Sequence, residues 1–448
     1  MSSIELHIIQ NFPPSNLNRD DIGQPKSTDF GGVRRARISS QCQKRAIRLH
    51  PAFAKATGVA PSDRTKRIQE CLEQAILNSK ITTINAEAEV MATLVARSYG
   101  QQDGKDLEKD ETETLIYVSD YELGELVNSI CQRWSEIDWL PVAQGLDQIR
   151  QKREEILSAQ SNEERKKLYA AIYKSTDEIG KVSAAAKNYK LPAGKKEAKK
   201  KVDATLYLIS DEIVSAVLPS KKGSPVLSAP DIALFGRMLT ARPETNIDAA
   251  CQVAHAISTH KVGKADIDYY TAMDDVKQRM KDPGAGFLDV AYFNSACFYR
   301  YIRIDFAQLE KTLGDHDMAV KTVEGFMRAA EAAVPSGKQN SHAQFTRPSF
   351  MLAVLRPDGS DGWNLVNAFE KPIRVTENDE QGLIEKSVQA LEARFNHQCQ
   401  FYGDDAVSTV AVALPDGVIN KEHLSKPLAD VTKGLNDWVK TITSKLGN

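Results

Sequence analysis

The sequence predicts an α+β fold in which a core of strands and helices is interrupted by an all-α insertion. Residues 4–8 alternate apolar and polar side chains, which is the pattern of a half-buried strand. From about residue 61 to residue 220 the chain is rich in Ala, Leu, Glu, Lys and Gln, a composition typical of helices. After Pro225 the patterns of strands and helices alternate again, so we expect the parts on either side of the insertion to form one core.

Each expected element has a local signal. Residues 4–8 form the first strand, and the Pro-, Asn- and Asp-rich residues 11–29 predict a loop without regular structure. A helix is expected to begin at Ser40, because Ser40 and Gln43 have the spacing of a capping box. In the C-terminal part, strands are expected at 298–306, 350–355 and 407–414, and helices where one face is apolar, at 323–330 and 384–395.

Composition limits the function classes. The 448 residues carry 58 basic and 60 acidic side chains, so a nucleic-acid site must come from uneven placement of charge. No apolar run reaches the ~20 residues of a membrane span, and the N-terminus has no signal-peptide pattern. The six cysteines are widely spaced without a CxxC pair, which is typical of reduced thiols. We therefore expect a cytoplasmic protein without membrane contact.

The strongest local signal is the basic segment 30–62, which contains no Asp or Glu. On the expected helix, Gln41, Lys44 and Arg48 share one stripe. Donors beside a helix N-terminus, preceded by Gly31 and Gly32, can hold phosphates. A solvated basic face is the usual alternative, but such faces normally mix both signs of charge. An apolar stripe that can pack on the sheet lies next to the polar one and consists of Ile38, Cys42, Ala46 and Leu49.

Several segments along the chain also carry unusual motifs. They are 17–21 (LNRDD), 30–41 (FGGVRRARISSQ), 44–48 (KRAIR), 231–238 (DIALFGRM), 254–260 (AHAISTH), 270–275 (YTAMDD), 298–301 (FYRY), 335–341 (PSGKQNS) and 367–371 (NAFEK). In this order they resemble the CasC-type backbone subunit, of the RAMP superfamily, in the type I-E CRISPR Cascade complex. The resemblance covers residues 4 to about 372.

The resemblance implies a modified RRM-like (ferredoxin-like) palm with a large helical fingers insertion and a β-hairpin thumb. Residues 1–58 would be the first part of the palm and 59–224 the fingers. Residues 225–448 would be the second part of the palm, including the thumb hairpin at about 241–292. Subunits of this family are non-catalytic, bind the guide RNA (crRNA) and stack along it. Each thumb kinks the guide so that every sixth nucleotide is flipped aside.

The resemblance also implies residue roles. Contacts to RNA phosphate and sugar would be made by Arg19, Lys26, Arg37, Ser40, Gln41, Lys44, Arg45 and Arg48. The apolar wedge at the kink would be formed by Met238, Tyr270, Thr271 and Leu288. Lys338 and Gln339 would touch RNA or a neighbouring subunit, and Lys371 and Arg374 would handle target DNA. A subunit that serves any guide must grip phosphate and ribose and leave base edges free, which agrees with these roles.

For two groups of residues, the sequence leaves a second interpretation open. Ordinary core packing is the competing explanation for Met238, Tyr270 and Leu288. Tyr299 and Tyr301, which share a strand face with Arg303, are either stacking aromatics of an RRM or core and intersubunit residues. The partners implied by the family are the guide crRNA, target DNA, further copies of the chain, the large and small Cascade subunits, the subunits that bind the 5′ and 3′ ends of the guide, and a recruited helicase-nuclease.

The main enzymatic alternative is a metal-dependent ribonuclease of the same superfamily. The adjacent acids 20–21 and 274–275 could hold Mg²⁺, but neighbouring acids point different ways, and loop capping or a salt bridge explains them better. His255 and His260 are out of register for two metal ligands on one helical face. Residues 336–338 lack the frame of a Walker loop. We therefore expect no catalytic residues, metal or cofactor.

Overall fold

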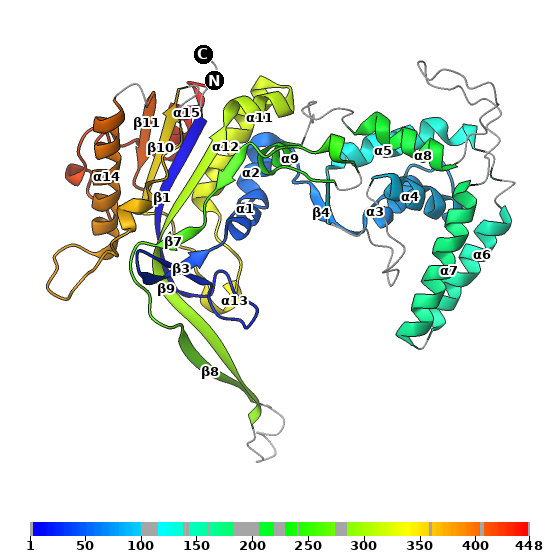
Figure 1. Ribbon diagram of the computed structural model, residues 1–448, viewed down its shortest axis with the longest axis horizontal. Helices are drawn as coiled ribbons and strands as arrows, with labels where there is room; N and C mark the ends of the chain where they lie inside the picture. The colour runs from blue at the N-terminus through cyan, green and yellow to red at the C-terminus, as the bar shows by residue number, and fades with distance from the viewer. Residues whose placement is uncertain are drawn as a thin grey trace. The chain divides into compact units, whose positions relative to one another are not determined.

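The computed structural model describes residues 3–99, 115–137, 139, 143–159, 161–181, 206–218, 229–239, 242–273, 285–357, 361–403 and 407–446. The chain divides into two compact units (Figure 1). The sheet unit consists of Met1–Val59 and Ala249–Asn448, and the helical unit is Ala60–Asp248. The α+β class is therefore confirmed. Residues 225–248, which the sequence assigned to the palm, belong to the helical unit.

The sheet unit is built on an antiparallel sheet with the strand order β11-β10-β1-β9-β7-β3-β2. The strands are β1 (Ser3–Ser15), β2 (Ser27–Phe30), β3 (Val33–Ile38), β6 (Cys251–Val253), β7 (Ala256–Ser258), β8 (Asp266–Met273), β9 (Ala285–Asp305), β10 (Phe350–Arg356) and β11 (Thr409–Ala413). The long strand β9 pairs with β1 and β7 in this order and also with β6 and β8. It therefore joins the centre of the sheet to the β8–β9 hairpin, which projects from the sheet (Figure 1).

The first strand is longer than the sequence predicted. β1 continues to Ser15, and its register with β9 shifts between Phe12 and Ser15. Pro13 and Pro14 lie at this irregularity, where the missing backbone N–H groups interrupt no regular ladder. The prediction that 11–29 contains no regular structure is wrong at both ends, because β2 already begins at Ser27.

Helices cover both faces of the sheet (Figure 1). One face carries α1 (Ser40–Arg48), α2 (Pro51–Thr57), α11 (Phe306–Leu313) and α12 (His316–Ala332); the other carries η4 (Leu365–Phe369) and α14 (Leu383–Tyr402). α15 (Leu435–Thr443) packs beside β10 and β11. The apolar face predicted for 323–330 is confirmed, since its residues are buried in α12: Val323, Phe326, Met327 and Ala330.

The sheet face under η4 and α14 holds a buried polar network centred on Glu5. Its carboxylate accepts hydrogen bonds from the Tyr301 hydroxyl at 2.7 Å and the Trp363 backbone N–H at 2.6 Å, and it contacts the Arg356 guanidinium. The Tyr299 hydroxyl accepts from the Leu365 backbone N–H at 3.1 Å. Both tyrosines are buried. Of the two interpretations of Tyr299 and Tyr301, the structure therefore supports core residues and not a stacking platform.

The helical unit contains α3 (Ile68–Asn78), α4 (Asn85–Tyr99), α5 (Asp120–Arg133), α6 (Ala143–Ser158), α7 (Asn162–Lys181), α8 (Leu206–Val217) and α9 (Pro230–Phe235). The predicted helical character is thus confirmed for most of the described residues of this stretch. The exception is a two-stranded sheet of β4 (Asp63–Thr65) and β5 (Ile116–Val118). No helix in the described ranges combines the length and the apolar character needed to cross a membrane.

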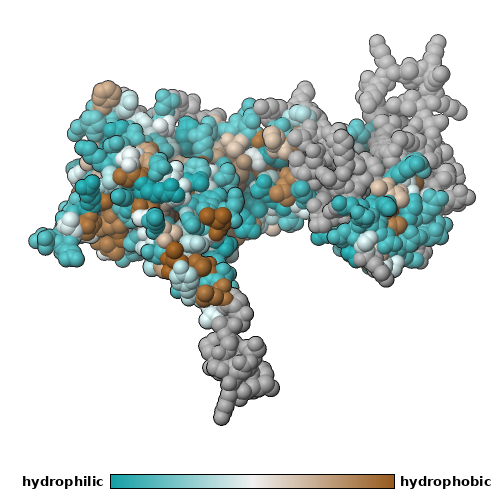
Figure 2. All heavy atoms as spheres, turned by 60° about the horizontal axis from the view of Figure 1, so that its bottom comes forward, coloured by the Kyte–Doolittle hydropathy of each residue, from teal (hydrophilic) through white to brown (hydrophobic). Residues whose placement is uncertain are grey.

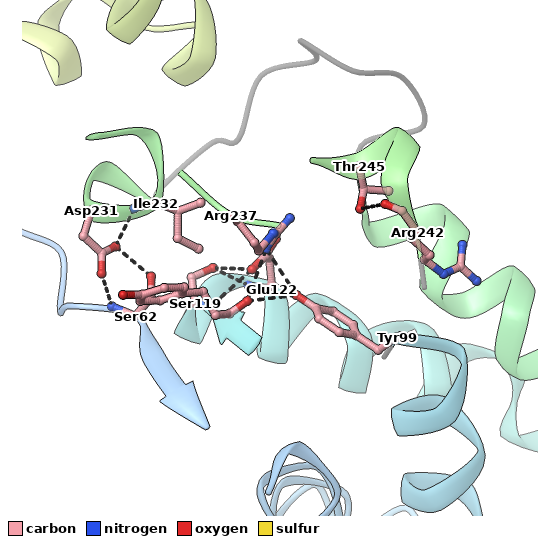
Figure 3. A network of polar contacts seen from close by, with 10 residues as sticks. Ser62, Tyr99, Ser119, Glu122, Asp231, Ile232, Arg237, Arg242 and Thr245 are labelled. Atoms are coloured by element: carbon pink, nitrogen blue, oxygen red, sulfur yellow. Dashed lines mark hydrogen bonds and ion pairs between the residues drawn. The ribbon is translucent and has the colours of Figure 1, made fainter. Parts of the chain in front are cut away.

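A buried polar network fixes the segment around Arg237 in the helical unit (Figure 3). Arg237 Nη1 donates to Glu122 Oε1 at 2.6 Å and to the Tyr99 hydroxyl at 3.2 Å. Glu122 also forms a capping box with Ser119 at the start of α5. The backbone of Arg237 exchanges both hydrogen bonds with Ile247. Residues far apart in the sequence are thereby locked together around the end of the DIALFGRM motif.

Candidate nucleic-acid interface

The basic helix α1 begins where the sequence predicted, but its cap is different. Ser39, not Ser40, is the N-cap, and its hydroxyl accepts a hydrogen bond from the Cys42 backbone N–H at 3.3 Å. The side chain of Gln43 is buried and donates to the Ala254 carbonyl at 2.9 Å instead of closing a capping box. The predicted capping box is wrong, because Gln43 faces the β6–β7 connection.

The buried stripe of α1 also differs from the predicted one. Gln43, Ile47 and Arg48 are buried, whereas Leu49, predicted to pack on the sheet, is exposed. Arg48 is only 8% exposed. A phosphate contact requires a guanidinium that reaches solvent, so the low exposure of Arg48 does not favour the predicted RNA contact, which stays a prediction. Its side chain lies instead on the packed side of the helix, next to Ile47.

Arg35 is a second basic residue of the segment 30–62 whose side chain stabilises the fold. Its guanidinium donates to the carbonyls of Phe369 at 2.6 Å, Ser258 at 3.2 Å and Phe30 at 3.2 Å. Burial lowers the pKa of Arg35, and the nearby Glu370 raises it in part. Arg35, in β3, therefore connects the ends of β2 and β7 with η4. The excess of basic residues in 30–62 is partly structural.

The remaining predicted contacts of this segment converge on one surface. The Lys26 backbone accepts a hydrogen bond from the Arg37 N–H at 2.9 Å and donates to the Asn18 carbonyl at 2.8 Å. The Asn18 side chain in turn accepts from the Ser39 backbone N–H at 2.8 Å, at the start of α1. Among the predicted contacts, Arg19, Gln41 and Arg45 are exposed, and the half-buried ones are Lys26, Arg37, Ser40 and Lys44.

A groove in the sheet unit lies beside these residues. It runs between the loop 17–23, the exposed side of α1 with Arg45, and the loop 333–337. A Cβ atom on Gly337 would lie 2.5 Å from the Leu17 carbonyl oxygen, so only glycine allows this close approach. The loop that carries Lys338 and Gln339 is thus held next to the groove, with Lys338 exposed.

Of the carboxylate pair 20–21, Asp20 has a local role in the loop beside this groove. Asp20 Oδ1 accepts from the backbone N–H groups of Ile22 at 3.1 Å and Gln24 at 2.8 Å. This is the loop capping that the sequence favoured over a metal site. The other pair, 274–275, lies outside the described residues.

The β8–β9 hairpin presents the predicted wedge residues on two different faces. Tyr270 pairs with Asp289 and Thr271 with Leu288. Because side chains alternate along a strand, Tyr270 lies on one face and Thr271 and Leu288 lie on the other. Tyr270 is 38% and Leu288 71% exposed, so ordinary core packing does not explain them. Figure 2 shows apolar side chains at the surface around the root of this hairpin.

Sequence reasoning missed Tyr269, which shares the face of Leu288 and is 66% exposed. Ile267 lies on the same face and is also exposed. The signal was present in the alternation of Ile267, Tyr269 and Thr271 along β8. An aromatic residue next to Leu288 gives this face a larger apolar surface than the sequence predicted.

Met238 belongs to the helical unit, and the other wedge candidates belong to the sheet unit. Its side chain is 73% exposed, while its neighbours Arg237 and Leu239 are buried. Leu239 is further fixed by a hydrogen bond from its backbone N–H to the Asn246 side chain at 2.6 Å. The anchored neighbours hold Met238 outward, which argues against core packing for this residue as well.

The two residues predicted to handle target DNA are exposed and follow η4. Ile373, between them, donates its backbone N–H to the Thr259 carbonyl at 3.0 Å. A Cβ atom on Gly31 would lie 1.8 Å from the Glu370 carbonyl oxygen, so the β2–β3 turn packs directly on this segment. Gly31 therefore allows the backbone of the β2–β3 turn to approach the backbone of Glu370. The exposed residues beside it are Lys371 and Arg374.

The two candidate metal-ligating histidines have separate partners. His260 Nε2 accepts from the Cys297 backbone N–H at 3.3 Å, and its Nδ1 lies 2.9 Å from the Lys261 carbonyl. His255 Nδ1 contacts Arg37. Among the described residues, no three His, Cys, Asp or Glu side chains are grouped as metal ligands.

The fold is similar to that of chains in two solved complexes. A chain of a "CRISPR RNA-guided surveillance complex, pre-nicking" matches with a TM-score of 0.69 and 25% identity, over 99% of this chain and 100% of that one. A chain of a "CRISPR RNA-guided surveillance complex" matches with a TM-score of 0.62 and 21% identity, over 99% of each. The search of curated proteins found no significant match.

The sequence itself matches the family of CT1975-like proteins over residues 4–440, which is nearly the whole chain. This match covers both units and every motif on which the resemblance to a Cascade subunit was based. The resemblance is thereby confirmed at the level of the family. This chain belongs to the CT1975-like family of Cas proteins.

Proposed function

We propose that the chain is a non-catalytic, guide-RNA-binding backbone subunit of a Cascade surveillance complex. The observation that carries the proposal is that Arg19, Lys26, Arg37 and Gln41 lie around the N-terminal end of α1, with Arg45 exposed in the last turn of the same helix. The first turn of α1 contains no acidic residue. Charge and backbone N–H groups that meet at one helix end favour a phosphate backbone as the ligand.

We further propose that the sheet unit is a modified RRM-like palm. Its elements follow the order β1, α1–α2, β7, β9, α11–α12, β10, a β-α-β-β-α-β arrangement in which β1 and β9 are central. The helical unit would then be the fingers and the β8–β9 hairpin the thumb. In an ordinary RRM the open sheet face binds RNA. Here η4 and α14 cover that face, so the basic surface beside α1 would replace it.

The distribution of side chains supports a sequence-independent grip. Arginine and lysine side chains at α1 suit phosphate and ribose, which carry no sequence information. Exposed apolar side chains on the hairpin suit insertion beside a base, because every base has a stackable face. A guide held in this manner keeps its base edges free for pairing with a target.

Further partners belong to the same proposal. Copies of the chain would stack along one guide, and Lys371 and Arg374 would contact target DNA. The other Cascade subunits and a recruited helicase-nuclease would complete the cytoplasmic assembly. The similarity to chains of RNA-guided surveillance complexes supports guide RNA and other subunits of such a complex as partners.

The salt dependence of RNA binding tests the basic surface. Removing a side chain that binds one phosphate of a single strand should reduce the slope of log K against log salt by about 0.7. Arg37→Ala and Arg45→Ala should each show this reduction for guides of unrelated sequence. Lys421→Ala, an exposed lysine in η6 (Lys421–His423), is the matched control. Unchanged slopes in both arginine variants would show that this surface is only a solvated basic face that does not bind RNA.

Two further measurements test assembly and catalysis. Light scattering with and without guide RNA should show large particles only when RNA is present, because the guide is the proposed scaffold. The assembled particle should not cleave complementary RNA when Mg²⁺ is added. Assembly without RNA would contradict the scaffold role, and metal-dependent cleavage would support the ribonuclease instead.

A further inference from the structure

His255 adds an uncharged but titratable group to the basic surface beside α1. It is exposed in the connection between β6 and β7, where Arg37 Nη1 lies 3.3 Å from its Nδ1 atom. A guanidinium can only donate, so Nδ1 is the acceptor and the ring proton resides on Nε2. His255 is therefore neutral in this arrangement, and its Nδ1 atom is held by Arg37.

The charges around His255 are of one sign. Burial lowers the pKa of His255, and the cations Arg37, from β3, and Lys26, from the loop before β2, lower it further. The neighbouring helix α1 contributes Gln43, an uncharged side chain that donates to the adjacent Ala254 carbonyl. A third cation is thus disfavoured in the free protein, and an anion placed among these three side chains would remove that penalty.

We propose that Lys26, Arg37 and His255 form one phosphate site for the nucleic-acid backbone, and that His255 takes up a proton when the phosphate binds. The inference rests on the proposed guide-binding function and assigns a new phosphate-binding residue to it. A proton from solvent adds to Nδ1, the hydrogen bond from Arg37 breaks, and both N–H groups become available to phosphate oxygens. The guanidinium released from His255 can donate to the same phosphate.

The linkage has a defined sign. The bound state holds one proton more than the free state wherever the pH lies between the two pKa values of His255. RNA binding should therefore tighten as the pH falls from about 8 to about 6, which spans the ordinary range of histidine. Below the pKa of the free protein both states are protonated, and the dependence should level off.

The experiment measures the affinity of the intact chain for a short uridine oligonucleotide that accommodates one copy. Uracil does not titrate between about pH 6 and 8, so changes in this window come from the protein. The wild type should bind roughly three- to tenfold more tightly at the lower pH, a change of up to one proton per site. His255→Gln should lose this dependence and bind with the same affinity at both pH values.

A control variant and a direct titration separate the possible explanations. His423→Gln, exposed in η6, should retain the wild-type pH dependence. In histidine-labelled protein, the NMR signal that disappears in His255→Gln should titrate at higher pH when the oligonucleotide is bound. An unchanged pKa on binding, or a pH dependence that survives in His255→Gln, would overturn the inference. Failure of the wild type to bind at any pH would instead overturn the proposed function.

Discussion

The Tyr270 hydroxyl donates a hydrogen bond to the Asp289 carboxylate across the β8–β9 hairpin, with an O–O distance of 2.9 Å. The same carboxylate accepts from the Val290 backbone N–H at 2.7 Å. These bonds lower the pKa of Asp289, and the positive charge of Lys338 lowers it further. Tyr270 is therefore held on one face of the hairpin, next to the loop that carries Lys338. The opposite face presents Tyr269 and Leu288.

The two faces of the hairpin should differ in their effect on a bound guide. Removal of one aromatic ring that stacks on a base costs roughly 1–3 kcal/mol. Tyr269→Ala with Leu288→Ala, and separately Tyr270→Ala, should each leave most of the total binding free energy intact, because the phosphate contacts beside α1 are separate. Only the face that inserts beside a base should change the periodic pattern of the guide. Chemical probing of bound RNA detects this as blurring of the one reactive nucleotide in six that the family predicts.

Tyr270→Phe is the control, since it keeps the ring and removes only the bond to Asp289. The pattern should then remain at its positions even if Tyr270 is the inserting residue. A sharp pattern in both alanine variants would contradict the wedge role for the hairpin as a whole.

Arg45 and Arg48 should respond differently to the same substitution. Arg45 is exposed and lines the groove, whereas Arg48 is buried on the packed side of α1. Arg45→Ala should reduce the salt slope of RNA binding with little change in stability. Arg48→Ala should instead lower the free energy of unfolding by about 1–3 kcal/mol, as expected for a buried position. Urea unfolding followed by circular dichroism, together with binding at several salt concentrations, separates the two effects.

Equal changes in salt slope for both arginines, with equal stability, would show that Arg48 reaches the RNA. Lys44→Ala tests the intermediate case, because Lys44 is half-buried and its Nζ lies 3.5 Å from the Cys251 carbonyl. We expect a change in slope for Lys44, since a long side chain can leave that carbonyl for a phosphate.

The contrast between Arg45 and Arg48 shows which features of the site could be predicted from the sequence. The absence of acids in 30–62 indicated the basic segment, and the start of α1 was predicted at Ser40, although from a capping box that the structure does not contain. Periodicity could not tell which stripe packs, because the packed side of α1 contains Gln43 and Arg48, and a polar residue gives no burial signal. Gln43 is buried only because the Ala254 carbonyl lies within reach of its amide. That carbonyl is more than two hundred residues away in the sequence.

The same limit applies to the sheet. The strands in the C-terminal part were predictable from the residues of each segment alone. The cover over Tyr299 and Tyr301 was not, since it depends on Gly362, where a Cβ atom would lie 2.7 Å from the Tyr301 hydroxyl. Local patterns therefore predicted the elements and the basic segment, and long-range interactions decided which side chains reach solvent.

The network at Glu5 should make folding sensitive to acid. Burial raises the pKa of Glu5, but hydrogen bonding and charge interaction with His7, together with Arg356 and Tyr301, lower it to about 2. A carboxyl whose pKa is lower in the folded than in the unfolded state stabilises the fold at pH values above its pKa in the unfolded state. This stabilisation is lost as the pH falls from about 4.5 toward about 2. Burial also lowers the pKa of His7, which adds a loss of stability below about pH 6.5.

Glu5→Gln should abolish the carboxyl part of this dependence. At neutral pH it should also destabilise the sheet unit by about 3–5 kcal/mol, because Arg356 would remain buried without its counter-charge. Urea unfolding at several pH values measures both effects. Glu377→Gln, an exposed acid beyond η4, is the matched control and should unfold like the wild type. Identical pH profiles for Glu5→Gln and wild type would contradict the role of Glu5.

Glu122 should be essential to the helical unit, because it is the acidic partner of a buried arginine. Within the described part of the chain, Arg237 Nε and Nη2 are buried without a hydrogen-bond partner. The ion pair from Nη1 to Glu122 therefore offsets most of the cost of burying the guanidinium charge. Glu122→Gln should therefore destabilise this unit by about 3–5 kcal/mol. Hydrogen exchange should show faster exchange in α4 and α5. Met238→Ala, next to Arg237 but exposed, should leave stability within about 0.5 kcal/mol and alter only the bound guide. Unchanged protection in Glu122→Gln would show that the network does not fix the segment that presents Met238.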